Sequence, residues 1–263
     1  MPYVDSAGLR LYYTETGSGP PVLWHTGGCG DARMWQRAGY IEGLPGYRHI
    51  LFDHRGHGRS QAPEGMAGHH MSCYVADVVA VLDDAGIERA AMIGYSQGAR
   101  VGYAVAAAHQ ERLAALVGLD SVPGPEEQPA HLRADAATVL ADGTRAVIEK
   151  IASTESEAPP AWLFDHLCAT DPASLAGAYE AFATAPAFWP AAGQITVPTL
   201  FLLGVCADEQ DWWALGQTAA GAMPRGQAAA LNGLGHLQAF WRTDLALPPI
   251  KRFLATLSAA AWA

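Results

Sequence analysis

One serine of this 263-residue chain lies in a pattern that could support nucleophilic catalysis. Residues 94–98 read Gly-Tyr-Ser-Gln-Gly, directly after an apolar run at 91–93 and before an alanine-rich segment. This context predicts a strand, a sharp turn and a helix, with Ser96 on the turn. The flanking glycines tolerate a crowded backbone, and the start of the helix presents main-chain amides to a developing oxyanion.

A serine hydroxyl is a weak nucleophile near neutral pH. It needs an adjacent imidazole as general base, and the imidazole needs a carboxylate that holds its tautomer. The chain offers 10 histidines for the first role. The partners of Ser96 must therefore be sought among the elements that surround its turn.

These elements alternate short apolar runs with helix-like segments, which is the pattern of a parallel sheet covered on both faces. The runs predicted as strands are 9–15, 22–25, 49–52, 90–94, 113–119, 198–204 and 227–231. Helices are predicted at 72–84, at 97–109, and from 249 to about 260. The predicted fold class is α/β, with a mostly parallel central sheet and helices on both faces.

The alternation of strand-like and helix-like segments stops after Asp120. A Val-Pro-Gly-Pro segment at 122–125 interrupts the chain, and the residues up to 192 are rich in alanine, acids and aromatics without a convincing strand. We therefore expect a core domain formed by residues 1–121 and 193–263. A helical cap at 122–192 is expected between two of its strands.

A second motif connects the chain to a known family. Residues 53–60, Asp-His-Arg-Gly-His-Gly-Arg-Ser, follow the run at 49–52 and match D-x-R-G-x-G-x-S. Together with the turn at Ser96, this loop resembles the α/β-hydrolase superfamily, in particular its serine esterases, lactonases and carbon–carbon bond hydrolases. The resemblance covers nearly the whole chain and implies that fold, with a structural role for the loop.

The resemblance also implies a catalytic triad of Ser96, Asp208 and His236. His236 follows the last strand-like run and precedes the C-terminal helix, where the superfamily places its histidine. Asp208 follows the strand at 198–204, whose end usually carries the acid, with one residue more than the usual spacing. The alternative acids are Glu209 and Asp211 on the same loop, and Asp120 at the end of the run 113–119, a position from which some members supply it.

The superfamily's oxyanion motif, H-G-x, resembles residues 25–28, which read His-Thr-Gly-Gly. Threonine takes the usual glycine position, so the donor amide is that of Gly27, which we prefer, or of Gly28. The second donor is expected to be the amide of Gln97, directly after the nucleophile.

The implied activity is hydrolysis of a small to medium, largely apolar ester or lactone through an acyl-enzyme. Serine at position 96 argues against the chemistry of epoxide hydrolases and dehalogenases, which requires a carboxylate nucleophile. Carbon–carbon bond hydrolases, thioesterases and cofactor-free haloperoxidases or perhydrolases use similar triads. A ligand receptor without turnover is the alternative from a different functional class.

The cap is expected to cover the C-terminal ends of the strands, where open α/β sheets bind ligands. Most of its aromatic residues should pack the cap onto the core. A subset should still line the substrate pocket, and Trp162, Phe188 and Trp189 are the residues predicted for this role.

Composition excludes several other classes of function. The formal net charge of −10 leaves no basic surface for nucleic acid or for an anionic membrane. The four cysteines are widely scattered, and the paired histidines at 54/57 and 69/70 lack the spacing of a metal site. Neither a secretory signal nor a spanning segment is recognised. We expect a cytoplasmic enzyme with a small-molecule substrate and no metal or cofactor, and leave the oligomeric state open.

Overall fold

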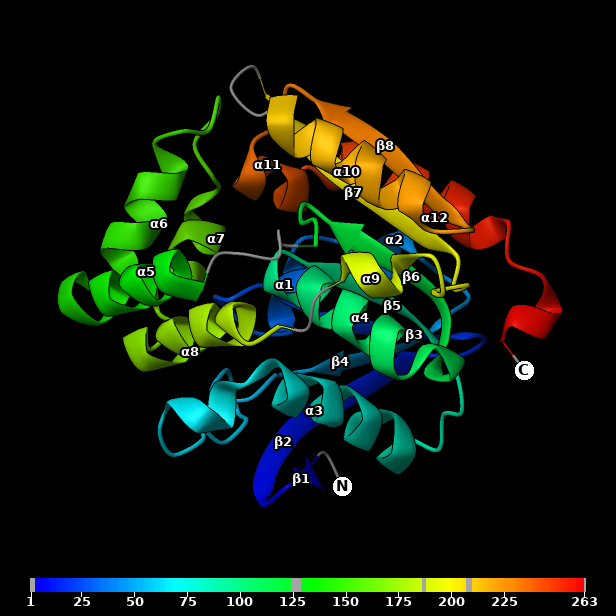
Figure 1. Ribbon diagram of the computed structural model, residues 1–263, viewed down its shortest axis with the longest axis horizontal. Helices are drawn as coiled ribbons and strands as arrows, with labels where there is room; N and C mark the ends of the chain where they lie inside the picture. The colour runs from blue at the N-terminus through cyan, green and yellow to red at the C-terminus, as the bar shows by residue number, and fades with distance from the viewer. Residues whose placement is uncertain (1–2, 124–128, 186–187, 207–209, 263) are drawn as a thin grey trace.

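A computed structural model describes residues 3–123, 129–185, 188–206 and 210–262 (Figure 1). The strands are β1 (Tyr3–Ser6), β2 (Leu9–Gly17), β3 (Pro21–His25), β4 (Arg48–Phe52), β5 (Ala90–Tyr95), β6 (Leu113–Leu119), β7 (Thr199–Val205) and β8 (Gly226–Asn232). Within these residues they form one eight-stranded sheet in the order β1-β2-β4-β3-β5-β6-β7-β8. The pairs β1–β2 and β2–β4 are antiparallel, and all other neighbours are parallel.

The central strands are apolar on both faces. Along β5, Ala91 and Ile93 join the core cluster on one side of the sheet, and Met92 joins the cluster on the other. This arrangement explains why the sequence shows short continuous apolar runs instead of alternating apolar and polar residues. The predicted parallel sheet with two covered faces is confirmed.

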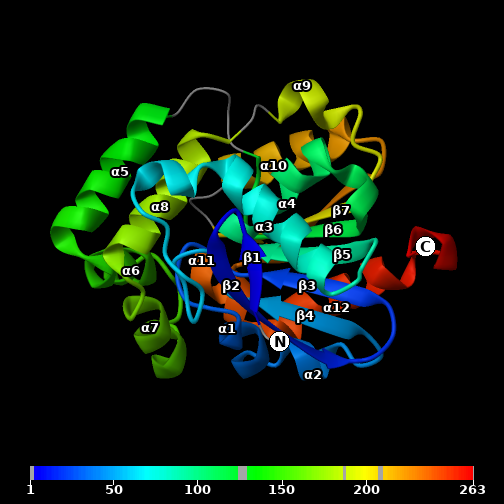
Figure 2. The same cartoon turned by 90° about the horizontal axis from the view of Figure 1, so that it is seen from below.

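Helices cover the two faces as separate layers (Figure 2). One layer contains α3 (Met71–Asp84), α4 (Gln97–Ala108) and α10 (Gln210–Ala222). The other contains α1 (Arg33–Arg37), α2 (Tyr40–Gly43), α11 (His236–Trp241) and α12 (Thr243–Ala255). Short 3-10 turns lie at η1 (Met66–His69), η2 (Gln110–Arg112) and η3 (Ala259–Ala261).

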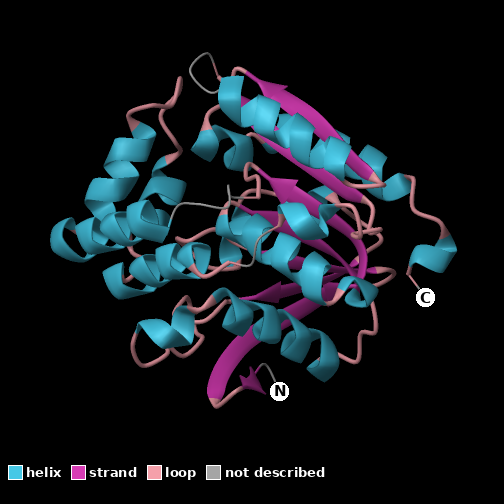
Figure 3. Ribbon diagram, in the orientation of Figure 1, coloured by secondary structure: helices cyan, strands magenta, loops and turns pink. Residues whose placement is uncertain are grey.

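Between β6 and β7 the chain forms α5 (Pro129–Asp142), α6 (Thr144–Ala152), α7 (Ala161–Cys168), α8 (Pro172–Ala183) and α9 (Trp189–Ala192). We call α5–α8 the cap, and these helices stand together at one end of the sheet (Figures 1 and 3). Hydrogen bonds attach the cap to the core. For example, Gly30 N donates to Thr170 Oγ1 at 2.8 Å, and Ser174 Oγ donates to Gly56 O at 2.6 Å.

Three features differ from the sequence prediction. The edge strand β1 and the short helices α1 and α2 were not predicted. The C-terminal helix begins at Thr243, earlier than the predicted 249, and it contains Pro248 and Pro249 in its interior, where proline is unfavourable. No helix of the described residues is long and apolar enough to cross a bilayer.

Candidate active site

Ser96 occupies a strained turn between β5 and α4. Its φ of 53° and ψ of −113° lie in a backbone region that residues other than glycine rarely adopt. A Cβ on Gly98 would lie 2.3 Å from the carbonyl oxygen of His25, and one on Gly94 would lie 2.3 Å from the backbone of Gly98. Both glycines of the motif are therefore required by close backbone packing, and the predicted strand, turn and helix are confirmed.

His236, the first residue of α11, connects the serine to a carboxylate. Its Nε2 lies 3.1 Å from Ser96 Oγ, and its Nδ1 lies 2.6 Å from Oδ2 of Asp120. The other oxygen of Asp120, Oδ1, accepts a hydrogen bond from Gly204 N at 2.7 Å. The Asp120 side chain is buried. One of its oxygens contacts the histidine, and the other accepts a hydrogen bond from the main chain of β7.

The carboxylate at His236 Nδ1 is thus Asp120, the alternative acid, and this corrects the sequence prediction of Asp208 for that contact. The reason is strand order. Tyr95 of β5 pairs with Leu119 of β6, so the residues that follow these strands lie side by side. Asp208 and Glu209 lie outside the described residues.

Tyr95, the variable residue before the serine, supports the histidine. Its ring stacks on the His236 imidazole with centroids 5.1 Å apart, and its Oη donates to the His236 carbonyl oxygen at 3.0 Å. Burial raises the pKa of Tyr95 well above its ordinary value, and the nearby Asp120 and Glu155 add to the effect. The side chain is therefore a neutral hydrogen-bond donor that holds the imidazole in place.

Gly27 and Gln97, the predicted oxyanion donors, both lie next to Ser96. A Cβ on Gly27 would come within 3.2 Å of the serine Cβ, so its main chain passes directly beside the nucleophile. Gln97 is the first residue of α4, and the first amides of a helix have no partner within the helix. The unusual Thr26 is buried, and its Oγ1 lies 3.2 Å from His54 Nδ1.

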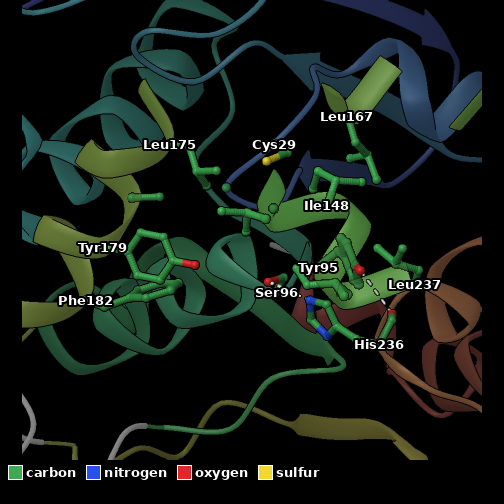
Figure 4. A pocket seen from close by; sticks show the side chains of 15 residues that line it. Cys29, Tyr95, Ser96, Ile148, Leu167, Leu175, Tyr179, Phe182, His236 and Leu237 are labelled. Atoms are coloured by element: carbon green, nitrogen blue, oxygen red, sulfur yellow. Dashed lines mark hydrogen bonds between the residues drawn. The ribbon is translucent and has the colours of Figure 1, made fainter. Parts of the chain in front are cut away.

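Two adjoining cavities meet at His236. The narrow chamber has a volume of about 130 Å³ and is enclosed largely by apolar side chains (Figure 4). It is lined by Gly27, Gly28, Cys29, Tyr95, Ser96, Val147, Ile148, Ile151, Leu167, Leu175, Ala178, Tyr179, Phe182, His236 and Leu237. The wide chamber, of about 600 Å³, is also lined largely by apolar groups, and its wall in addition carries charged and polar side chains: Asp120, Asp135, Thr138, Asp142, Lys150, Thr154, Tyr179, Trp212 and His236. Val147 and Ile151 lie between the two chambers and line both.

The three aromatic residues predicted to line the pocket line neither of these two chambers. Trp162 packs on the core cluster, and Cζ of the Arg37 guanidinium lies 4.8 Å from the centroid of the tryptophan ring. Phe188 contacts the ring of Tyr103 on α4, and Trp189 packs on the same side of the sheet. These residues pack on the core clusters. The cap residues that line the narrow chamber are aliphatic side chains of α6, α7 and α8 together with two other aromatics of α8, Tyr179 and Phe182.

Cys29 lines the narrow chamber but is not suited to be a nucleophile. Burial raises the pKa of its thiol to about 12, so it stays protonated near neutral pH. Among the described residues, no three His, Cys, Asp or Glu side chains gather in a way that could hold a metal ion.

The chain is similar in sequence to known proteins. A sequence model of the family described as alpha/beta hydrolase fold matches residues 20–166. Epoxide hydrolase A of Mycobacterium tuberculosis is 36% identical over 122 residues, which are 46% of this chain and 38% of that enzyme. Non-heme chloroperoxidase of Streptomyces lividans is 37% identical over 121 residues, 45% of this chain and 43% of that enzyme. The chain thus spans less than half the length of these two relatives.

Solved structures extend the similarity to the whole chain. An esterase from Thermogutta terrifontis superposes with a TM-score of 0.83 at 23% identity, and the match covers 97% of this chain and 98% of that one. At this level of identity the likeness concerns the fold.

Proposed function

We propose that this chain, which belongs to the alpha/beta hydrolase fold family, is a serine hydrolase that cleaves a small to medium, largely apolar ester or lactone through an acyl-enzyme. The observation that carries the proposal is the hydrogen-bonded series from Ser96 Oγ to His236 and on to Asp120, with distances of 3.1 and 2.6 Å. A hydroxyl, an imidazole and a buried carboxylate in this order form a proton relay.

The proposed reaction has two steps. In the first, His236 Nε2 takes the hydroxyl proton while Ser96 Oγ attacks the carbonyl carbon, and the amides of Gly27 and Gln97 stabilise the oxyanion. The imidazolium, stabilised by Asp120, then gives its proton to the departing alkoxide. In the second step water attacks the acyl-enzyme by the same route, which releases the acid and restores the serine.

The two chambers suggest how the substrate divides between them. The narrow chamber is lined by Ile148, Leu167 and Leu175, and its volume of about 130 Å³ is much smaller than the 600 Å³ of the wide chamber. We assign the acyl group to this chamber and expect it to be short and apolar. The leaving group then extends into the wide chamber, whose 600 Å³ accept a larger alcohol and whose wall carries charged side chains such as Asp142 and Lys150.

Serine at position 96 separates the proposal from epoxide hydrolysis, in spite of the similarity to epoxide hydrolase A, because that chemistry requires a carboxylate nucleophile. A second candidate is perhydrolysis on the same triad, which the similarity to the chloroperoxidase favours. In that reaction hydrogen peroxide takes the place of water and the acyl group leaves as a peracid.

The proposed compartment is the cytoplasm, in keeping with the free thiols of Cys29, Cys73 and Cys168.

The test is turnover of a panel of p-nitrophenyl esters, lactones and thioesters by the wild type and by Ser96→Ala. The variant should lose activity by about three orders of magnitude or more. Ser153→Ala, at an exposed position in the cap, is the matched control and should match the wild type. Stoichiometric labelling of Ser96 by a fluorophosphonate without turnover of any ester would instead favour a ligand receptor.

A further inference from the structure

The turn that carries His236 is hydrogen-bonded to a carboxylate of the cap. Glu155 follows α6, and its Oε1 accepts from Leu237 N at 2.7 Å while its Oε2 accepts from Gln238 N at 3.1 Å. These are the second and third residues of α11, whose amides have no acceptor within their own helix. The cap thereby supplies the hydrogen bonds that the first turn of α11 lacks.

The neighbouring residues strengthen the same connection. Ser156 Oγ donates to Oε1 of the Gln238 side chain at 2.9 Å, and that oxygen also accepts from Gly235 N at 3.2 Å. A Cβ at Gly235 would come within 2.7 Å of Glu155 Oε2, so glycine is required for the carboxylate to approach. Two consecutive cap residues therefore hold the backbone on both sides of His236.

The charge of Glu155 also acts on the imidazole. His236 faces Asp120 from the end of β6, the neutral phenol of Tyr95 from β5 and Glu155 from the cap, and Lys150 lines the chamber beside it. Burial raises the pKa of the Glu155 carboxyl, and the two backbone donors and the attraction of His236 lower it. Both oxygens of Glu155 accept hydrogen bonds from main-chain N–H groups, an arrangement that favours the ionised carboxylate.

We propose that Glu155 is a positioning residue for His236, a role that rests on the proposed function. Its two hydrogen bonds hold the first turn of α11 so that Nε2 faces Ser96. Its negative charge favours the imidazolium that forms as the serine attacks. Because Ile148 and Ile151 of the preceding α6 line the narrow chamber, Glu155 also connects the acyl-binding wall to the general base.

The test compares Glu155→Gln, Glu155→Asp and the control Glu157→Gln, which removes the same charge from an exposed side chain two residues away. In Glu155→Gln we expect kcat to fall about tenfold with KM changed less than about twofold, since the interaction strengthens in the transition state. The acid limb of the kcat/KM profile should move to lower pH, because loss of a nearby negative charge makes the imidazole harder to protonate.

The aspartate variant separates position from charge. Its carboxylate keeps the charge but is one methylene shorter, so the acid limb should stay near that of the wild type while kcat remains reduced. Glu157→Gln should match the wild type in both measurements. Equal kcat and equal acid limbs for Glu155→Gln and Glu157→Gln, with both proteins folded by thermal melting, would overturn the proposal.

A further measurement does not depend on turnover. The imidazole C–H resonance of His236, assigned by its absence in His236→Gln, is titrated by NMR in the wild type and in Glu155→Gln. Its midpoint should move to lower pH in Glu155→Gln, and an unchanged midpoint contradicts the role of the charge. If the wild type cleaves no substrate of the panel, the proposed function fails, while this titration still decides whether Glu155 acts on His236.

Discussion

Nδ1 of His236 and Oδ2 of Asp120 lie 2.6 Å apart, although the two residues are separated by 116 positions in the chain. The contact follows from the sheet, because Ser96 and Asp120 directly follow paired residues of the adjacent strands β5 and β6. Both have a positive φ, 53° and 48°. The backbone thus leaves the extended conformation at both strand ends, where the side chains turn towards the same imidazole.

Asp120→Asn should reduce kcat by about four orders of magnitude, since an amide at Nδ1 favours the wrong tautomer of His236. The control is Asp208→Asn, which tests the acid that the usual loop position favours. We expect it to stay within about threefold of the wild type. Steady-state kinetics on a p-nitrophenyl ester measures kcat of both variants. A larger loss of kcat in Asp208→Asn than in Asp120→Asn would show that Asp208, and not Asp120, is the triad acid.

The serine and the histidine could be predicted from sequence because each lies in a local pattern. The glycines around Ser96 are required within the same turn, and His236 follows the last strand directly. The acid is different, since its place depends on which strand end faces the imidazole. That relation appears only when the strand order and the register of β5 against β6 are known.

The core was predictable and the cap wall was not. Buried parallel strands appear in the sequence as apolar runs bounded by turns, so their positions could be read within one or two residues. The cap helices carry apolar residues on more than one side, and tertiary packing decides which side faces the substrate. Trp162 and Phe188 pack against the core, whereas Leu167 and the aromatics Tyr179 and Phe182 line the chamber.

Leu167→Ala should shift the acyl preference towards longer chains. The side chain is buried in α7 and lines only the narrow chamber of the two, so its truncation enlarges the acyl site. We expect the ratio of kcat/KM for hexanoate over acetate esters to rise about tenfold, which corresponds to about 1.4 kcal/mol for a few buried methylenes. The variant should also lose about 2–5 kcal/mol of stability.

Leu140→Ala is the matched control for this variant, because it makes the same truncation at an exposed position of the cap. Its chain-length profile should superimpose on that of the wild type. An unchanged profile in Leu167→Ala would mean that the acyl group does not occupy the narrow chamber.

The wide chamber should prefer a cationic leaving group to a neutral one of the same shape. Among the described residues that line it, Asp120, Asp135 and Asp142 carry carboxylates and Lys150 carries an ammonium. Acetylcholine and 3,3-dimethylbutyl acetate differ by one charge and are nearly equal in size. We expect kcat/KM for the cation to be about threefold higher in low salt and the difference to shrink in high salt, because exposed charges are screened.

Asp142→Asn should reduce this preference for the cation, whereas Asp165→Asn, an exposed position of α7, should leave it unchanged. A higher kcat/KM for the neutral ester in the wild type at low salt would contradict the assignment of the leaving group to the wide chamber.

Acid should destabilise the fold through a stack of buried histidines. The His54 ring lies 3.8 Å from that of His57 and 4.9 Å from that of His25. Burial lowers the pKa of all three, that of His25 to about 4, so they are neutral when folded. The unfolded chain binds protons below pH ~6.5, and stability is therefore lost as pH falls below that value.

His54→Phe should flatten this dependence, because it keeps an aromatic ring in the stack and removes one group that titrates on unfolding. Urea unfolding between pH 7.5 and 5 measures the effect. Each buried neutral histidine contributes a slope of about 1.4 kcal/mol per pH unit below pH ~6.5, and the variant should lose about that much of the wild-type slope. Parallel curves for His54→Phe and the wild type would show that His54 does not titrate on unfolding, and the acid sensitivity would then have to come from other groups.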